Sequence, residues 1–199
     1  MNIFFLSQDP IEAAQMMVDR HVVKMILESA QLLSTAHRIL DGVEDVKLVN
    51  NRKKKTYTLG DAREPVLYQA THVNHPSSVW CRTSVENYNW LVEHMFALMD
   101  EYTYRYDKKH KCSGELSYML QSPPKNLKDW DMTTIPCAMD DKYIVSSDAV
   151  DNYRNYYKVG KTHLHSWKKR EAPDWILSEK ILLSLMICYQ KKIRISIMI

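Results

Sequence analysis

Residues 21–38, HVVKMILESAQLLSTAHR, form the most regular stretch of this 199-residue chain. Nine of its eighteen positions are apolar, and they include a run typical of a helix that packs inside a protein. Ionisable, amide and hydroxyl residues interrupt it at steps of three and four: His21, Lys24, Glu28, Gln31 and Thr35. This spacing places the five residues on one row of an α-helix. The stretch therefore predicts a long helix that is apolar on both flanks of a narrow polar row.

The composition favours a single, mainly helical domain that spans residues 1–199. The chain is long enough to bury a core, and its 4 Gly and 7 Pro are few beside its 11 Met and 12 Tyr. A turn-rich sandwich or barrel is therefore disfavoured, and we expect an all-α protein.

Cysteine usage and the apolar segments predict a cytoplasmic protein without a membrane partner. The four cysteines form no CxxC pair and are expected to be free thiols: Cys81, Cys112, Cys137 and Cys188. The first residues do not resemble a secretory signal. The apolar stretch Ile176–Ile187 is interrupted by residues 178–180, and it is too short to span a bilayer.

The first helix is predicted from Pro10 to about Leu40, with Gly42 ending it at the C′ position. A small basic hairpin around Asn50 and Asn51 is predicted at about 43–64, although a flexible loop there is the alternative.

Two further helices follow. One begins after Thr83, which has capping-box spacing to Glu86. Its apolar face comprises Val85, Tyr88, Leu91, Val92, Met95, Met99 and Tyr102. The other is capped by Asp148 and ends near Gly160.

The polar row of the first helix has two interpretations. In one, Lys24 and Glu28 form a partly buried ion pair that closes the helix packing, with His21 and Gln31 hydrogen-bonded beside it. In the other, the row faces a pocket where burial and Lys24 set the protonation state of Glu28, as acid–base sites require. We favour the pocket, because Lys and Glu are rarely buried unless they are paired or lie in a cleft.

A second cluster is THVNHP, residues 71–76, which Arg82 follows before the second helix. His72 and His75 are three residues apart, but Pro76 breaks the local geometry and no third ligand is evident, so no metal site is expected. Two interpretations stay open: an anion or nucleotide contact beside a helix N-terminus, and a structural turn in which His75 caps a neighbouring element.

Basic and aromatic residues alternate in EYTYRYDKKHK, from Glu101, and in YRNYYKVGK, from Tyr153. Lys and Arg neutralise phosphates and Tyr rings stack on bases, and the net charge of +3 permits nucleic acid as a partner. We expect about half of these tyrosines in the core. The candidate contacts in the second segment are Tyr153, Arg154, Tyr156, Tyr157, Lys158 and Lys161. His163 and His165 are expected in a solvated loop.

Several of these stretches together resemble the pyrimidine-dimer DNA glycosylases of the phage endonuclease V type. They are MNIFFLSQDP (1–10), HVVKMILESAQ (21–31), NHPSSVW (74–80), DEYTYRYDKKHK (100–111) and YRNYYKVGK (153–161). The resemblance implies a compact helix bundle without a cofactor. It also implies a free N-terminal amine that attacks the sugar C1′, and a glutamate on the first long helix that assists base loss and strand cleavage.

On this sequence the resemblance assigns the amine to Met1, retained because Asn2 is large, and the glutamate to Glu28, with His21 and Lys24 in support. An α-amine titrates near pH 8, so part of it is nucleophilic at neutral pH. DNA would be the partner. Its contacts would be the basic hairpin, the Tyr and Lys residues above, and Gln31, His72, His75 and Arg82.

One position departs from the family pattern, in which an arginine immediately precedes the glutamate. Here that position is Leu27, which cannot contact phosphate, and Lys24 lacks the planar fork of an arginine. Besides a DNA glycosylase with lyase activity, two alternatives therefore stay open. One is a hydrolase or binding protein for a free nucleotide or nucleotide-derived signal that uses the same pocket. The other is a non-catalytic nucleic-acid-binding module.

Overall fold

A computed structural model describes residues 1–49 and 52–177. It is mainly helical, as predicted, with one two-stranded antiparallel hairpin. The helices are α1 (Pro10–Gln15), α2 (Asp19–Asp41), α3 (Pro76–Cys81), α4 (Val85–Tyr106), α5 (Glu115–Met119) and α6 (Ala149–Asn155), and the strands are β1 (Val43–Val49) and β2 (Arg52–Thr58). A π-helical turn, Tyr156–Gly160, continues α6.

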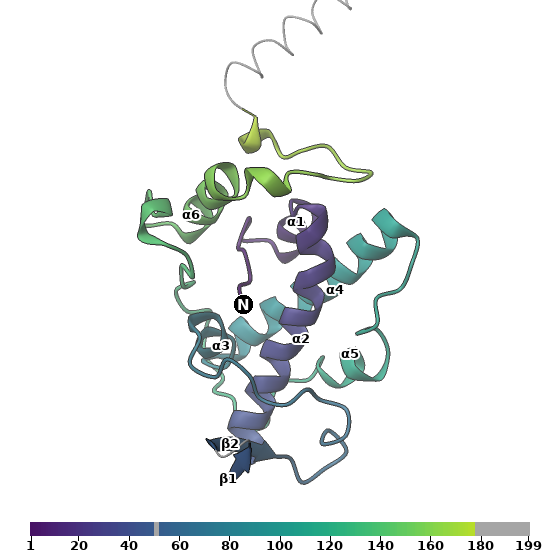
Figure 1. Cartoon of the computed structure of the whole chain (residues 1–199), viewed down its shortest axis with the longest axis vertical. Coiled ribbons are helices and arrows are strands. Elements are labelled where there is room, and N and C mark those ends of the chain that lie inside the picture. The colour runs from purple at the N-terminus through teal and green to yellow at the C-terminus, as the bar shows by residue number, and fades with distance from the viewer. Residues whose placement is uncertain (50–51, 178–199) are drawn as a thin grey trace, which may run out of the picture.

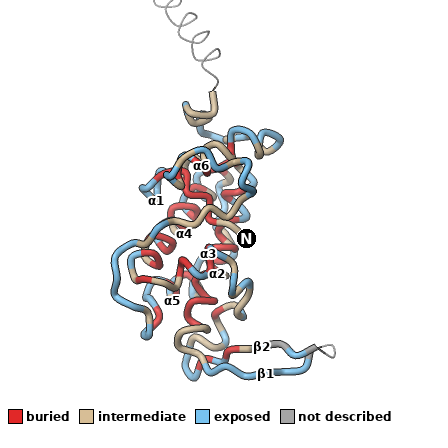
Figure 2. Tube along the Cα trace, turned by 90° about the vertical axis from the view of Figure 1, so that its left-hand side faces the viewer, coloured by how far each residue is buried: buried red, intermediate tan, exposed pale blue. Residues whose placement is uncertain are grey.

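The core forms where α2 and α1 pack against α4 (Figure 1). Met25 and Ile26 of α2 and Leu91 and Met95 of α4 are buried there. The extended segment Ile3–Leu6 is also buried. Figure 2 shows buried residues through the body and exposed residues along the hairpin. The first residues of the chain therefore belong to the core.

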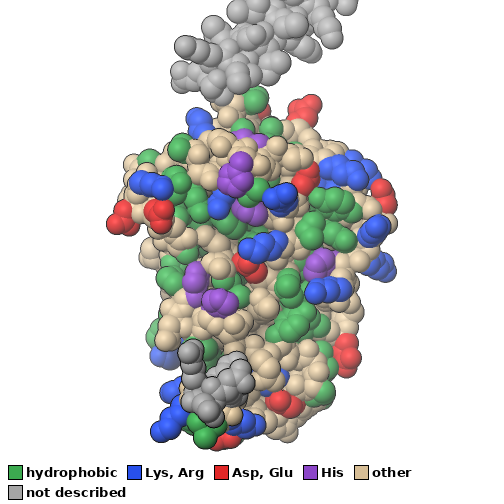
Figure 3. Space-filling model, viewed as in Figure 1, with side chains coloured by type: hydrophobic (Ala, Val, Ile, Leu, Met, Phe, Trp, Pro, Cys, Tyr) green, Lys and Arg blue, Asp and Glu red, His purple; other side chains and the backbone are tan. Residues whose placement is uncertain are grey.

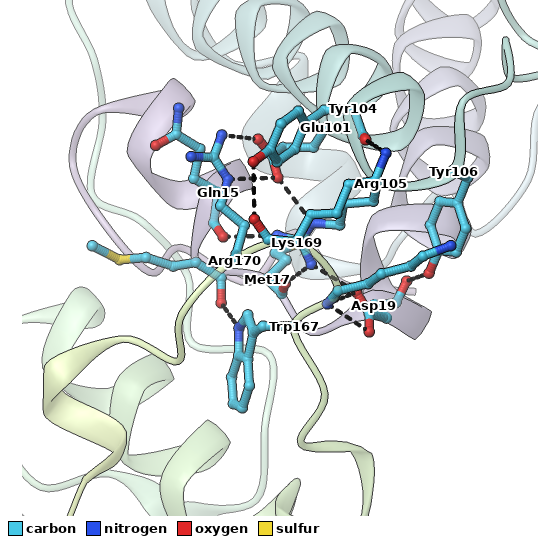
Figure 4. Close-up of polar contacts among 12 residues, drawn as sticks. Gln15, Met17, Asp19, Glu101, Tyr104, Arg105, Tyr106, Trp167, Lys169 and Arg170 are labelled. Atoms are coloured by element: carbon cyan, nitrogen blue, oxygen red, sulfur yellow. Dashed lines mark hydrogen bonds and ion pairs between the residues drawn. The ribbon is translucent and has the colours of Figure 1, made fainter.

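The prediction of one continuous helix from Pro10 to Leu40 is wrong at residues 16–18, where α1 ends and α2 begins. Side chains from distant segments bind the carbonyls at the break (Figure 4). Arg105 donates to the carbonyls of Gln15 and Met17 at 2.8 and 2.9 Å, and Trp167 donates to that of Met16 at 2.9 Å. These bonds replace the helical ones, so the chain can change direction without leaving buried carbonyls unpaired.

Two predicted helix ends differ in detail. Gly42 does end α2, but its φ is −86° and not left-handed. A side chain there would meet the Arg38 carbonyl oxygen, so close approach explains the glycine. Helix α4 is capped by Ser84, whose hydroxyl accepts from the Asn87 backbone N–H at 3.2 Å, and the predicted cap at Thr83 is wrong by one residue. The predicted cap of α6 by Asp148 is confirmed.

The predicted hairpin is confirmed over residues 43–58. Residues 59–64 form no strand, and Asn50 and Asn51 lie outside the described residues. Arg38 anchors the base of the hairpin, since its guanidinium donates to the Tyr57 carbonyl at 2.8 Å and to Glu64 Oε2 at 2.9 Å.

No helix in residues 1–49 or 52–177 is long and apolar enough to cross a membrane. Cys81, Cys112 and Cys137 are free thiols, as predicted. Cys188 and nearly all of the apolar C-terminal stretch lie outside the described residues.

Candidate functional site

The polar row of α2 is the line along which three distant segments meet the helix. His21 Nδ1 lies 2.5 Å from the Tyr157 hydroxyl. Glu28 Oε2 accepts from the Asn2 backbone N–H at 3.0 Å. Thr35 Oγ1 accepts from the Thr71 N–H at 3.2 Å. The row therefore holds the C-terminal aromatic segment, the N-terminus and the 71–75 loop against one helix.

Glu28 is the acidic centre of this row. Its side chain is 11% exposed, and its Oε1 pairs at 3.0 Å with the Lys24 ammonium, which is 66% exposed. Met1 is half-buried beside it. In the described part of the chain the Met1 amine forms no ion pair with Glu28, and the Asn2 backbone N–H and the Lys24 ammonium each bind one oxygen of the carboxylate. The Met1 amine thus belongs to the residue immediately before Asn2, whose N–H binds the Glu28 carboxylate.

Asn2 fixes the direction of the N-terminus. Its side-chain amide donates to the Ala138 carbonyl at 2.8 Å, and its Oδ1 accepts from the backbone N–H groups of Ile3 and Phe4 at 2.8 and 3.2 Å. Phe4 has a φ of 60°, a left-handed conformation that costs a bulky residue on the order of 1–3 kcal/mol. Strain of this kind is typical of functional sites and is maintained here by the surrounding contacts.

The 71–75 loop brings two histidines to the same place. His75 caps α3, since its Nδ1 accepts from the Ser77 N–H at 3.2 Å, as one of the two interpretations predicted. Burial lowers the pKa of His75, and the positive charges of the Met1 amine and His72 lower it further, against the opposing charge of Glu28. His72 is exposed. No group of three His, Cys, Asp or Glu side chains suited to a metal occurs within the described ranges.

An aromatic cluster borders the other end of the row. Phe4 stacks on His21 with ring centroids 4.3 Å apart and lies 6.2 Å from Tyr156. The Lys161 ammonium lies over the Tyr156 ring at 4.6 Å. Burial, followed by the charges of Lys161, Lys24 and His163, lowers the pKa of His21 to about 3. His21 is therefore a neutral imidazole at physiological pH.

The remaining predicted residues are not gathered at Glu28. Tyr153 and Tyr157 are buried, and the Tyr153 hydroxyl donates to the Pro136 carbonyl at 2.8 Å. Arg154 and Lys158 line a separate hollow of about 440 Å³. Arg82 follows the C-terminal end of α3 and donates to Ser78 Oγ at 3.1 Å. Gln31 is half-buried one turn after Glu28.

Sequence reasoning missed two residues of the site, Asn2 and Phe4. In the sequence, the size of Asn2 indicated only that Met1 is retained, and not that Asn2 binds Glu28. Nothing in a short apolar run indicates that Phe4 adopts a left-handed backbone conformation. Five hollows of 380–460 Å³ on the described surface are lined by neither Lys24 nor Glu28, so none of these five is the pocket that the polar row was predicted to face. The ion pair between Lys24 and Glu28, which the other interpretation predicted, is present.

Figure 3 views the face that carries the N-terminus, where histidine and basic (Lys or Arg) side chains surround a small acidic patch over α2. Chemically, this face combines a carboxylate, a nearby primary amine and a neutral imidazole. Such a set can supply a nucleophile and move protons. Comparisons of the chain with protein families, with curated proteins and with solved structures found no match.

Proposed function

We propose that this protein is a DNA N-glycosylase with lyase activity that acts on damaged or modified bases. The observation that carries the proposal is the hydrogen bond of 3.0 Å between the Asn2 N–H and Glu28. It fixes the start of the chain on the one carboxylate of the polar row. A primary amine and a carboxylate are the two groups that such chemistry needs. The resemblance to the endonuclease V type assigns these roles to Met1 and Glu28.

In the proposed reaction the lone pair of the Met1 amine attacks C1′ of the target nucleotide. The C1′–N bond to the base breaks, and the base leaves with the bonding electrons and takes up a proton. Opening of the sugar ring then gives an iminium between Met1 and C1′. Glu28 stabilises the positive charge that develops on the sugar.

In the lyase step the Glu28 carboxylate removes a proton from C2′, and the C3′–O bond breaks to release the 3′ phosphate. Water then hydrolyses the imine and restores the amine. Lys24 and His21 are supporting groups: the Lys24 ammonium orients the carboxylate, and His21 presents an uncharged imidazole to the sugar and phosphate. The target nucleotide has to leave the base stack to reach these groups.

Borohydride trapping tests the covalent step. The protein is incubated with a duplex that contains an abasic site and is reduced with sodium borohydride, and the adduct is located by peptide mass spectrometry. We expect the adduct on Met1, and we expect it to persist in Lys24→Gln, which removes the other primary amine beside Glu28. Absence of an adduct, or an adduct on a lysine only, would contradict the proposal.

A second candidate function is cleavage of a free nucleotide or nucleotide-derived signal at the same site. One observation favours it: Leu27, which precedes Glu28, packs against the hydrophobic core, so no guanidinium accompanies the carboxylate there. Base release from a deoxynucleoside monophosphate, unaffected by salt, would support this candidate, because binding to duplex phosphates weakens steeply with salt. In the third alternative, a non-catalytic module, Glu28→Gln would retain full affinity for nucleic acid and full biological effect.

A further inference from the structure

The hairpin β1–β2 projects from the molecule as an arm. Figure 2 shows it extending beyond the body on the same side as the N-terminus. Three apolar side chains of β1 are not used for packing, since Val43, Val46 and Leu48 are 73%, 52% and 74% exposed. A nucleic acid that lies across the face with Glu28 would therefore also meet the hairpin.

The hairpin carries the whole net charge of the chain. Five of the 27 Lys and Arg residues and two of the 24 Asp and Glu residues fall within residues 43–58. The hairpin is thus +3, which equals the charge of the full chain, and the other residues are balanced. Concentration of charge on one projecting element is the electrostatic pattern of a contact with phosphates.

The strand register indicates that the hairpin is not optimised for its own stability. Lys47 lies opposite Lys54, and Leu48 lies opposite Lys53. Like charges directly opposite destabilise a strand pair, and a lone two-stranded hairpin is marginally stable in water. Glu44 pairs with Lys55 at 2.7 Å, whereas no carboxylate among the described side chains pairs with Lys47 or Lys53. Their charges are available to an outside partner.

The base of the hairpin is held firmly in place. Tyr57 and Leu59 are buried. The Arg38 guanidinium binds the Tyr57 carbonyl, and Glu64 Oε2 accepts from the Leu59 N–H at 2.6 Å. Helix α2 connects this base directly to Glu28. The hairpin therefore has a fixed position relative to the candidate site.

We propose that the hairpin binds the major groove of duplex DNA and that Lys47 and Lys53 contact the phosphates bordering it. The position on the duplex rests on the proposed function, which places the reacting nucleotide at Glu28. Glu28 and Asp41 are thirteen residues apart on α2, or about 20 Å at 1.5 Å per residue. That length corresponds to about six base pairs of duplex at 3.4 Å each.

The shape of the hairpin favours duplex DNA over other acidic partners. The major groove of B-form DNA accepts a two-stranded β-ribbon. Lys47 lies on one face of the ribbon, and Lys53 and Lys55 lie on the other, because neighbouring positions of a strand alternate and cross-strand partners share a face. A groove has phosphates on both sides, whereas a membrane surface or a flat acidic protein would meet only one face.

The test combines a salt titration with phosphate ethylation interference. Binding to an undamaged duplex is measured over a range of salt for the wild type, for Lys47→Gln/Lys53→Gln, and for the matched control Lys125→Gln/Lys128→Gln. The control removes two exposed lysines from the loop after α5. We expect the slope of log Kd against log salt to fall by about two in the hairpin variant and to stay unchanged in the control.

On a duplex with a central abasic-site analogue, we expect ethylation about six nucleotides to one side of the analogue to interfere with binding of the wild type but not of the hairpin variant. An unchanged salt slope in the hairpin variant would overturn the inference. So would binding to vesicles of acidic lipid without hairpin-dependent binding to DNA. Hairpin-dependent binding to DNA without a borohydride adduct would support the hairpin and contradict the proposed chemistry, so the two proposals fail separately.

Discussion

Helix α2 buries two charged side chains in different ways. Arg38 is fully buried, and each of its five N–H donors reaches an acceptor: the carbonyls of Tyr57, Glu64, Leu67 and Tyr68, and the Glu64 carboxylate. Glu28, ten residues earlier, binds one backbone N–H and one lysine that is itself exposed. A carboxylate can accept about four hydrogen bonds, so Glu28 keeps capacity that Arg38 does not have.

This difference separates a structural charge from a chemical one. A buried charge with all its partners inside the protein fixes the surrounding chain, and it cannot bind anything else without breaking those bonds. A charge that is partly unpaired at the edge of the core contributes less to the fold and remains free to bind a substrate or move a proton. The Arg38 end of α2 and the Glu28 end should therefore respond differently to substitution and to pH.

The largest expected effect is on the Arg38 end. Arg38→Met leaves Glu64 and four carbonyl groups without their donor, so we expect the free energy of unfolding to fall by about 3–5 kcal/mol. Urea denaturation at pH 7 measures it. The matched control is Arg20→Met on the same helix, where the arginine is exposed and the expected change is within about 0.5 kcal/mol. Equal effects of the two substitutions would show that the Arg38 contacts do not stabilise the fold.

A smaller effect is expected from acid, through His37 beside Arg38. Arg63 Nη1 donates to His37 Nδ1 at 2.8 Å, and His37 Nε2 lies 2.8 Å from the Tyr88 hydroxyl, which donates to the Leu120 carbonyl. This chain of bonds requires a neutral imidazole. Burial and the charge of Arg63 lower the pKa of His37 to about 4, against the opposing charges of Asp41 and Asp61.

The pKa of His37 in the unfolded chain is near 6.5, so the unfolded state binds the proton first as pH falls. The stability is fully present above pH 6.5 and is lost between about pH 6.5 and 4, by up to about 3 kcal/mol. Urea denaturation at pH 7 and pH 4.5 measures the loss. His37→Gln should be less stable at pH 7 and should lose less on acidification, with a remaining slope from the buried His21 and His94. An identical slope in the wild type and in His37→Gln would rule out His37 as a source.

The local patterns in the sequence predicted elements well and contacts poorly. Apolar periodicity located α2 and α4, and the two β-leaning runs around Asn50 and Asn51 located the hairpin. The break at residues 16–18 was not predictable, because it depends on Arg105 and Trp167, which are about 90 and 150 residues away. The polar row was recognised as unusual, but its meeting with Asn2, Tyr157 and Thr71 is a property of the tertiary fold.

The sequence also could not separate buried tyrosines from partly exposed ones near the candidate site. Tyr153 and Tyr156 both fit a stacking motif in the sequence, yet Tyr153 is buried with its hydroxyl on a backbone carbonyl, and Tyr156 is half-buried beneath Lys161. The two tyrosines are three residues apart, an offset of about 60° around an α-helix, and this offset separates the two roles. Periodicity alone cannot assign them, because the π-helical turn at Tyr156–Gly160 changes the phase where the motif lies.

The smallest effect on stability is expected at the Glu28 end. Glu28→Gln keeps an oxygen that accepts from the Asn2 N–H and loses the pair with an exposed lysine, which contributes little, so the free energy of unfolding should change by less than about 1 kcal/mol. If Glu28 is the proposed proton acceptor, base release and strand cleavage should fall by about 10²- to 10⁴-fold. Urea denaturation and single-turnover cleavage of an abasic duplex measure the two quantities on the same preparation, with Glu93→Gln, an exposed glutamate on α4, as the matched control. A loss of stability comparable to that of Arg38→Met would show that Glu28 is a structural charge like Arg38. Its main role would then be to bind the N-terminus, and not to bind a substrate or move a proton.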